Sequence, residues 1–318
     1  MPFFLPLAQA QPKGLPEIID NLARTPLSQV VMFVTVLTVI RVLLAPTLAK
    51  TPPHLRTGTY RGLRLVNELL DAVVYAGVFV FLIIRPFGVQ AFRIPSGSMW
   101  PTLYVNDFVV ANKAIYRYTD PKPGDIVVFR PPIEAILNKE EGLDADGQIK
   151  VDYIKRCVGV PGDVVELRDG ILFRNGKQVA DTTKHYSTSN DGGQNFNEVS
   201  PDLVPKASFK LAKDKDGKVI PLNYTADEAN AGMTGPGGSY QVNPKFIVES
   251  PEEQHRLIEA KPEPVPAGYY LMMGDNRNNS FDSRGWGLVP RESIIGRSEF
   301  IWLPVGRMGK TPSVDLNK

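Results

Sequence analysis

The sequence predicts a mainly β domain that is anchored by two N-terminal transmembrane α-helices. Two long apolar runs precede residue 90, and the chain after them consists of short β-type runs separated by Pro and Gly turns. With 318 residues, 43% of them hydrophobic and 22% charged, the chain can bury a core and form more than one structural unit. We therefore expect a membrane anchor followed by a globular β domain.

The charge and the cysteine content argue against several classes of partner and site. The net charge is only +2, and no basic patch with interleaved aromatic residues is present, so a nucleic-acid partner is not expected. Cys157 is the only cysteine, which excludes an internal disulfide. The three histidines, His54, His185 and His255, lack the spacing of metal ligands. We expect no metal and no cofactor.

Residues 1–26 are predicted to form a tail outside the cytoplasm. The tail contains Ala8-Gln9-Ala10, which resembles a signal-peptide cleavage site, but no cationic segment precedes it and its apolar run is too short. Residues 27–48 are predicted as the first transmembrane helix, since their length fits a hydrocarbon core of about 30 Å at about 1.5 Å per residue. Arg41 is the only charge in this run. A buried helix of a soluble domain is the alternative.

The second transmembrane helix is predicted over residues 69–89, with an uninterrupted apolar core at 72–84. The loop between the two runs, residues 49–68, contains four basic residues: Lys50, Arg56, Arg61 and Arg64. The tail contains only two, Lys13 and Arg24. The positive-inside rule then places the loop in the cytoplasm and everything after residue 89 on the outer side. In a bacterium, that side is the periplasm or the cell surface.

Residues 90–318 are predicted to form the β domain. The runs that favour strands are 107–111, 124–130, 151–160, 163–168, 171–174, 177–179, 268–273 and 294–303. Asn175-Gly176 is a strong signal for a two-residue hairpin turn. From about residue 180 to 266 the chain is polar and rich in Gly, Pro, Asn and Asp, which predicts an insertion of loops and small strands.

A candidate nucleophile lies shortly after the second apolar run. Ser96-Gly97-Ser98 is enclosed by Pro95 and Pro101, so the backbone is restricted at both ends and free to turn in the middle. A hydroxyl on such a bend can be presented to a substrate, although the same pattern also occurs in ordinary loops.

A lysine is the better candidate for a base than any histidine. The histidines lie in the predicted cytoplasmic loop or in the polar insertion, away from every well-defined strand. Lys155 lies inside an apolar β-run, and strand alternation places it on one face with Tyr153 and Cys157. A lysine acts as a base only when neutral, and burial lowers its pKa; a shift of about three pKa units corresponds to roughly 4 kcal/mol. The alternative is a solvated lysine at a sheet edge.

Three segments carry a family resemblance. They are Phe92-Arg-Ile-Pro-Ser-Gly-Ser-Met99 with Pro101-Thr-Leu103, then Tyr153-Ile-Lys-Arg156 with Gly159-Val-Pro-Gly-Asp163, and finally Gly274-Asp-Asn-Arg-Asn-Asn-Ser-Phe-Asp-Ser-Arg-Gly-Trp-Gly287. In this order, behind two apolar runs, they resemble bacterial type I signal peptidase, also called leader peptidase. The resemblance covers both apolar runs and most of the β domain outside residues 180–266.

The resemblance implies a serine endopeptidase of the bacterial cytoplasmic membrane. Such an enzyme removes signal peptides from exported precursors at Ala-x-Ala sites with a Ser-Lys dyad, and its catalytic domain lies on the periplasmic side. The implied partners are the signal peptides, the lipid bilayer and, by proximity, the translocation machinery. No cofactor is implied.

The resemblance also implies a role for each matched residue. Ser98 would be the nucleophile and Lys155 its general base. Ser96 would contribute to the oxyanion hole beside the Ser98 backbone N–H, and Ser280 would orient the lysine amine. The supporting ion pair would be Asp282 and Arg284. The residues implied to line shallow pockets for small substrate side chains are Phe92, Ile94, Tyr153 and Ile154.

Two positions depart from the family pattern, and two rival functions stay open. Cys157 stands where a small apolar residue is expected, and Gly285 where a larger side chain is common. One rival is a self-cleaving Ser-Lys protein of the LexA repressor type, whose fold around the dyad is similar but which carries a DNA-binding domain in place of membrane spans. The other rival is a catalytically inactive, membrane-tethered β domain that binds exported proteins.

Overall fold

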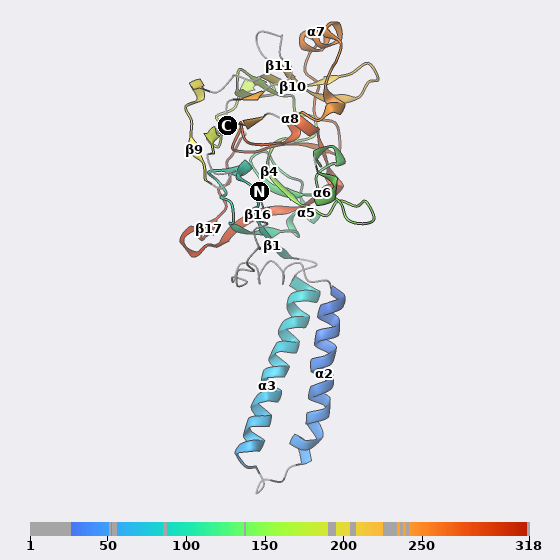
Figure 1. Ribbon diagram of the computed structural model, residues 1–318, viewed down its shortest axis with the longest axis vertical. Coiled ribbons are helices and arrows are strands. Elements are labelled where there is room, and N and C mark those ends of the chain that lie inside the picture. The colour runs from blue at the N-terminus through green and yellow to red at the C-terminus, as the bar shows by residue number, and fades with distance from the viewer. Residues whose placement is uncertain are drawn as a thin grey trace, which may run out of the picture. The chain divides into compact units, whose positions relative to one another are not determined.

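The computed structural model describes most of the chain and divides it into two compact units, Met1–Phe92 and Arg93–Lys318 (Figure 1). The described residues are 27–50, 52, 56–84, 88–136, 138–189, 195–203, 208–224, 234–235, 238–239 and 242–316. The predicted tail, residues 1–26, lies outside them.

The first unit is a pair of helices. Helix α2 covers Leu27–Lys50, and helix α3 covers Gly58–Val78 and continues as the π-helix η2, Phe79–Ile84. Figure 1 shows α2 and α3 side by side. Of the described helices, only the stretch Ser28–Lys50 of α2 is both long and apolar enough to cross a membrane. The first predicted span therefore has a matching helix, whereas a second span is not confirmed.

Helix α3 begins at Gly58 and not at Leu69, so most of the predicted loop over 49–68 is helical. This part of α3 is polar and contains two Leu and two Arg, which favour helix, and Arg64 contacts Glu68 one turn later at 3.0 Å. A hydropathy pattern detects only apolar helices, so the sequence did not predict the polar first part of α3 as a helix. At the other end, Val89, the last residue of the predicted span 69–89, is the first residue of the strand β1, Val89–Arg93.

A large antiparallel sheet forms the centre of the second unit. Its strands are β2 (Phe108–Asn112), β3 (Ile126–Phe129), β4 (Tyr153–Gly159), β14 (Tyr269–Met273), β15 (Val289–Pro290), β16 (Ile294–Leu303) and β17 (Gly309–Lys310). The strands follow the order β2-β16-β3-β4-β14-β15, and β17 pairs with β16. The mainly β domain predicted from the sequence is confirmed.

A second sheet packs beside the first. Its strands are β5 (Val165–Arg168), β6 (Ile171–Arg174), β7 (Lys177–Gln178), β10 (Ser208–Lys213) and β11 (Val219–Tyr224), in the order β11-β10-β5-β6-β7. One hydrophobic core joins the two sheets through Val158 of β4, Leu271 of β14 and Phe209 of β10. The opposite face of β4 and β14 contributes Cys157 and Met272 to a second core with Trp286. Strand β4 is therefore buried on both faces.

The insertion at 180–266 has more regular structure than its polar composition predicts. It supplies β10 and β11 to the second sheet, the short pair β8 (Ser187–Thr188) and β9 (Asn197–Glu198), and helix α7 (Pro251–Glu259). The sequence does carry a start signal for α7, since the Ser250 hydroxyl caps the Glu253 N–H and Pro251 follows directly.

Candidate active site

Ser98 lies in a short 3-10 turn, η3 (Gly97–Met99), which precedes β2. The turn is closed by a hydrogen bond from the Trp100 N–H to the Gly97 carbonyl at 3.0 Å. Met99 and Leu103 are fully buried and anchor this segment, so the Ser98 backbone is held by packing on its C-terminal side. Ser98 itself is 7% exposed, which leaves its hydroxyl at the edge of the core.

Lys155 meets Ser98 from strand β4. Its Nζ lies 2.7 Å from Ser98 Oγ and 3.2 Å from the carbonyl oxygen of Ile154, and it is 5.6 Å from the centre of the Tyr153 ring. Lys155 is only 5% exposed, because β4 runs through the middle of the sheet between β3 and β14. A solvated lysine at a sheet edge is therefore excluded.

Burial lowers the pKa of Lys155 from 10.5 to about 8. The charges of Asp282 and Asp275 oppose this shift by favouring the protonated amine, and the Arg284 charge adds to it. A lysine with this pKa is neutral in a substantial fraction of molecules near neutral pH, as a general base requires. The chemistry that this pair can perform is therefore proton transfer from the serine hydroxyl.

Ser96 stands at the open side of the pair. Its Oγ lies 3.4 Å from Ser98 Oγ, at the long end of the hydrogen-bond range, and the residue is exposed. The hydroxyl is thus close enough to reach an oxygen atom that develops charge next to Ser98.

Asp282 and Arg284 form the ion pair that the resemblance implies. The guanidinium donates to both carboxylate oxygens at 2.8 and 2.7 Å, and both side chains are almost fully buried. Burial raises the pKa of Asp282 to about 6 and lowers that of Arg284 to about 9. Both groups are therefore charged at pH 7, which the two-point contact requires.

Ser280 contacts Asp282 and not Lys155 in this structure. Its hydroxyl donates to the Asp282 carboxylate at 2.7 Å, which is the stronger acceptor because it is buried and charged. The Lys155 amine instead uses Ser98 and the Ile154 carbonyl. Ser280 nevertheless lies close by, since a Cβ added at Gly274 would come within 2.2 Å of Ser280 Oγ and 2.4 Å of the Ser98 carbonyl oxygen. Only glycine allows these two segments to approach at this point.

The residues implied to line substrate pockets differ in their exposure. Ile94 and Ile154 are 1% and 8% exposed, and Tyr153 is half-buried. Phe92 belongs to the first unit. The two isoleucine side chains are therefore buried in this structure, whereas Tyr153 is partly accessible.

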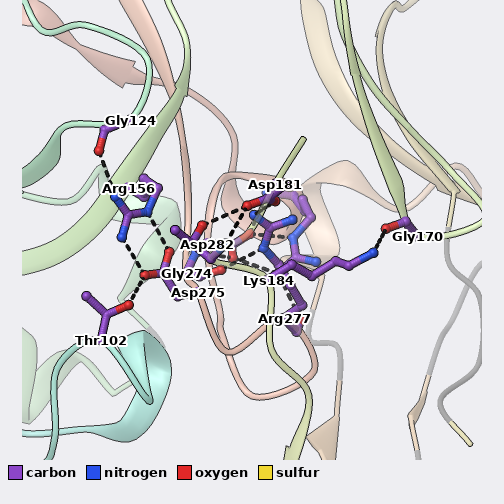
Figure 2. Close-up of polar contacts among 12 residues, drawn as sticks. Thr102, Gly124, Arg156, Gly170, Asp181, Lys184, Gly274, Asp275, Arg277 and Asp282 are labelled. Atoms are coloured by element: carbon purple, nitrogen blue, oxygen red, sulfur yellow. Dashed lines mark hydrogen bonds and ion pairs between the residues drawn. The ribbon is translucent and has the colours of Figure 1, made fainter. Parts of the chain in front are cut away.

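The structure reveals a second buried ion pair that the sequence analysis missed. Arg156 donates to both oxygens of Asp275 at 2.8 and 2.7 Å and to the Gly124 carbonyl at 2.7 Å, and both side chains are fully buried. Thr102 donates to the same carboxylate at 2.5 Å (Figure 2). This pair ties β4 to the turn after β14 and to the serine segment. The available signal was an arginine next to Lys155 in an apolar strand.

His185 lies beside the same turn, outside the named strands. It forms a parallel bridge with Asn276 next to β14, and its ring contacts Glu198 at 3.0 Å and the edge of Trp100. Ser98 Oγ, by contrast, is hydrogen-bonded to Lys155 and Ser96. Cys157 is fully buried in the second core, and burial raises the pKa of its thiol, as befits a small apolar residue.

Comparisons with known proteins identify the family of the chain. A model of the family "Signal peptidase, peptidase S26" matches residues 66–303. Signal peptidase I of Aquifex aeolicus is 34% identical over 243 residues, which cover 74% of this chain and 83% of that protein. Signal peptidase I of Pseudomonas fluorescens is 32% identical over 249 residues, which cover 71% and 69%. Signal peptidase I of Pseudomonas aeruginosa is 30% identical over 261 residues, which cover 74% of this chain and 73% of that protein. The chain therefore belongs to the signal peptidase family, peptidase S26.

Proposed function

We propose that this chain is a membrane-bound serine endopeptidase that cleaves signal peptides at Ala-x-Ala sites with Ser98 and Lys155 as its dyad. The observation that carries the proposal is the 2.7 Å contact between Ser98 Oγ and a lysine amine that is almost completely buried. Family membership supports signal peptide cleavage, and the expected preference for small side chains at Ala-x-Ala sites follows from the resemblance.

In the proposed mechanism the neutral amine of Lys155 accepts the hydroxyl proton as Ser98 Oγ attacks the scissile carbonyl carbon. The carbonyl oxygen becomes an oxyanion that the Ser98 N–H and the Ser96 hydroxyl stabilise. Lys155 then returns its proton to the departing amine, leaving an ester on Ser98. Lys155 then deprotonates a water molecule that attacks the ester carbonyl; as the ester bond to Ser98 Oγ breaks, the lysine returns this proton to Oγ, which releases the signal peptide and restores the dyad. Asp282, with Ser280 and Arg284, supplies the fixed charge beside the amine.

The substrate emerges from a bilayer, so we also propose that both helices of the first unit cross the membrane. The apolar stretch of α2 and the apolar second half of α3 with η2 support this. The second unit then lies on the outer side of the bacterial cytoplasmic membrane, near the translocation machinery that delivers precursors.

The test compares arginine at two buried lysines. An arginine keeps the charge but cannot become neutral in a protein, so Lys155→Arg should cut the cleavage of a precursor with an Ala-x-Ala site by about 10²- to 10⁴-fold or more. The matched control is Lys210→Arg. Lys210 is also a buried lysine on a strand, but its amine donates hydrogen bonds to the backbone carbonyls of Ile258 and Ala260 and not to a serine hydroxyl. Thermal melting shows whether each variant is folded. A folded Lys155→Arg protein that cleaves at the wild-type rate would refute the dyad.

A further inference from the structure

The insertion contacts the serine segment through the turn that follows β14. Asp181 pairs with Arg277 at 2.5 Å, and both side chains are buried (Figure 2). The His185 N–H donates to the Asp275 carbonyl at 2.9 Å, and the Arg277 N–H donates to the His185 carbonyl at 2.8 Å. The segment that leads into β8 is therefore docked along this turn by backbone and side-chain bonds.

Ser187, the first residue of β8, is fully buried and is surrounded by asparagines of the same turn. Its N–H donates to Asn278 Oδ1 at 2.9 Å, and its carbonyl accepts from Asn278 Nδ2 at 2.8 Å and Asn279 Nδ2 at 2.7 Å. Its hydroxyl donates to Asn276 Oδ1 at 2.9 Å and accepts from Asn279 Nδ2 at 3.0 Å. Every polar atom of Ser187 is thus used on this turn.

Asn276 links Ser187 to the backbone of the nucleophile segment. Its Nδ2 donates to the Gly97 carbonyl at 2.9 Å, and its backbone N–H donates to the Ser98 carbonyl at 3.1 Å. Because the Ser187 hydroxyl occupies Oδ1, the amide group can present only Nδ2 to Gly97. Asn276 is itself fully buried, so no water replaces either partner.

The Gly97 carbonyl and the Ser98 N–H belong to one planar peptide group and point in opposite directions. Asn276 Nδ2 and the Trp100 N–H both donate to this carbonyl, so together they fix the direction of the Ser98 N–H and polarise it. On the proposed mechanism, this N–H is the main-chain donor to the oxyanion.

We propose that Ser187 is a positioning residue for the oxyanion hole, acting through Asn276 on the Gly97–Ser98 peptide. The inference rests on the proposed Ser98–Lys155 mechanism and adds a part of the insertion to it. The insertion is then required for the chemical step and is more than an elaboration on the domain surface.

The experiment measures kcat and KM of Ser187→Ala on a precursor with an Ala-x-Ala site, in detergent, with the full-length chain. Loss of a complete oxyanion donor costs about 10²- to 10³-fold, so a misdirected donor should lower kcat by about 10-fold. KM should be unchanged, because Ser187 is fully buried against the turn and is not exposed to substrate. The rising limb of the pH profile should also be unchanged, because Lys155 keeps its surroundings.

Ser208→Ala is the matched control. Ser208 is another buried serine of the insertion, but its hydroxyl accepts from the Asp169 N–H on the second sheet. Asn276→Asp is the second variant, since it keeps the shape and sets an oxygen against the Gly97 carbonyl. It should lower kcat by more than Ser187→Ala, and it decides the question if Ser187→Ala fails to fold.

Three results would overturn the inference. They are a wild-type kcat in folded Ser187→Ala or Asn276→Asp, a loss confined to KM, and an equal kcat loss in Ser208→Ala. Ser98→Ala shows whether the proposed mechanism itself fails. An active Ser98→Ala enzyme would refute the Ser98–Lys155 dyad. An inactive Ser98→Ala enzyme together with a fully active Ser187→Ala enzyme would refute only the role of Ser187.

Discussion

Lys155 is held in a balance between burial and neighbouring charge. Burial disfavours the ammonium form, while the carboxylates of Asp282 and Asp275 favour it. The resulting pKa of about 8 is low enough for the neutral amine to be accessible and high enough for it to remain a competent base.

This balance predicts the pH dependence of catalysis. Below its pKa the amine is protonated and cannot accept the Ser98 proton, so kcat/KM should rise with pH through about 8 and then level off. A pH series of initial rates on a soluble precursor measures the limb. His185→Ala should show the same rise of kcat/KM with pH. If the wild-type rate instead rises near the ordinary histidine pKa of about 6.5, and His185→Ala loses this rise, the lysine base is contradicted.

A second prediction at the residue scale concerns Gly274. A methyl group there would collide with Ser280 Oγ and the Ser98 carbonyl, both at less than 3 Å from the added Cβ. Gly274→Ala should therefore displace Ser98 and lower kcat by about 10²-fold, on the order expected for a displacement of about 1 Å. Initial-rate kinetics with thermal melting measure the effect. Gly306→Ala is the control, because an added Cβ there meets no atom, and full activity in Gly274→Ala would contradict the close approach.

The candidate site was only partly predictable from the sequence. The pairing of Ser98 with Lys155 and that of Asp282 with Arg284 are predicted by motif and resemblance. The contact of Ser280 with Asp282, the Arg156–Asp275 pair and the bonds of Ser187 depend on the packing of segments far apart in the chain. Spacing alone does not reveal which of several polar partners a buried group selects.

Among the elements, the helices of the first unit carry an unexpected charge pair. Arg41 of α2 lies 2.6 Å from Asp71 of α3, and each residue stands near the middle of its helix. Asp71 stands at the start of the apolar part of α3, so if both helices cross the bilayer as proposed, each charge offsets the other at the edge of the apolar segment, where a single charge would be costly.

This pair predicts the behaviour of charge variants. Arg41→Leu should lower the amount of protein in the membrane and its melting temperature in detergent, because Asp71 is left without a counter-charge. The exchange Arg41→Asp with Asp71→Arg should restore both. The matched control is Arg64→Leu, whose partner Glu68 is on the same helix and exposed. Equal effects in Arg41→Leu and Arg64→Leu would contradict a special role of the interhelical pair.

Element prediction succeeded where hydrophobic pattern dominates and failed where it does not. The strands β2, β3, β4, β14 and β16 match predicted apolar runs to within a few residues. The polar first half of α3 and the strand β10 were missed, the latter because it alternates with lysines inside a polar region. Their formation depends on partners, α2 for α3 and β5 for β10, that a local pattern does not contain.

At the scale of the whole molecule, the proposed topology can be tested by labelling. Wild-type protein should be inert to a thiol reagent, since its one cysteine, Cys157, is fully buried with a raised pKa. With an impermeant maleimide on cells whose outer membrane is permeable, Tyr118→Cys should react, whereas Thr57→Cys should react only after lysis. Tyr118 is 86% exposed and Thr57 is exposed between the helices. Labelling of Thr57→Cys in intact cells would contradict the proposed topology.

The pairing of β10 with β5 has a consequence for self-association. Strand β5 has β6 on one side, and its other side is paired with β10, where Phe209 faces Leu167 and Lys210 faces Glu166. In a chain shortened by removal of the insertion, the N–H and carbonyl groups on that side of β5 would be left open, with apolar side chains beside them. Such an edge recruits the same edge of another copy. We therefore expect a variant without the insertion to self-associate through β5, because β10 covers that side of β5 in the full chain.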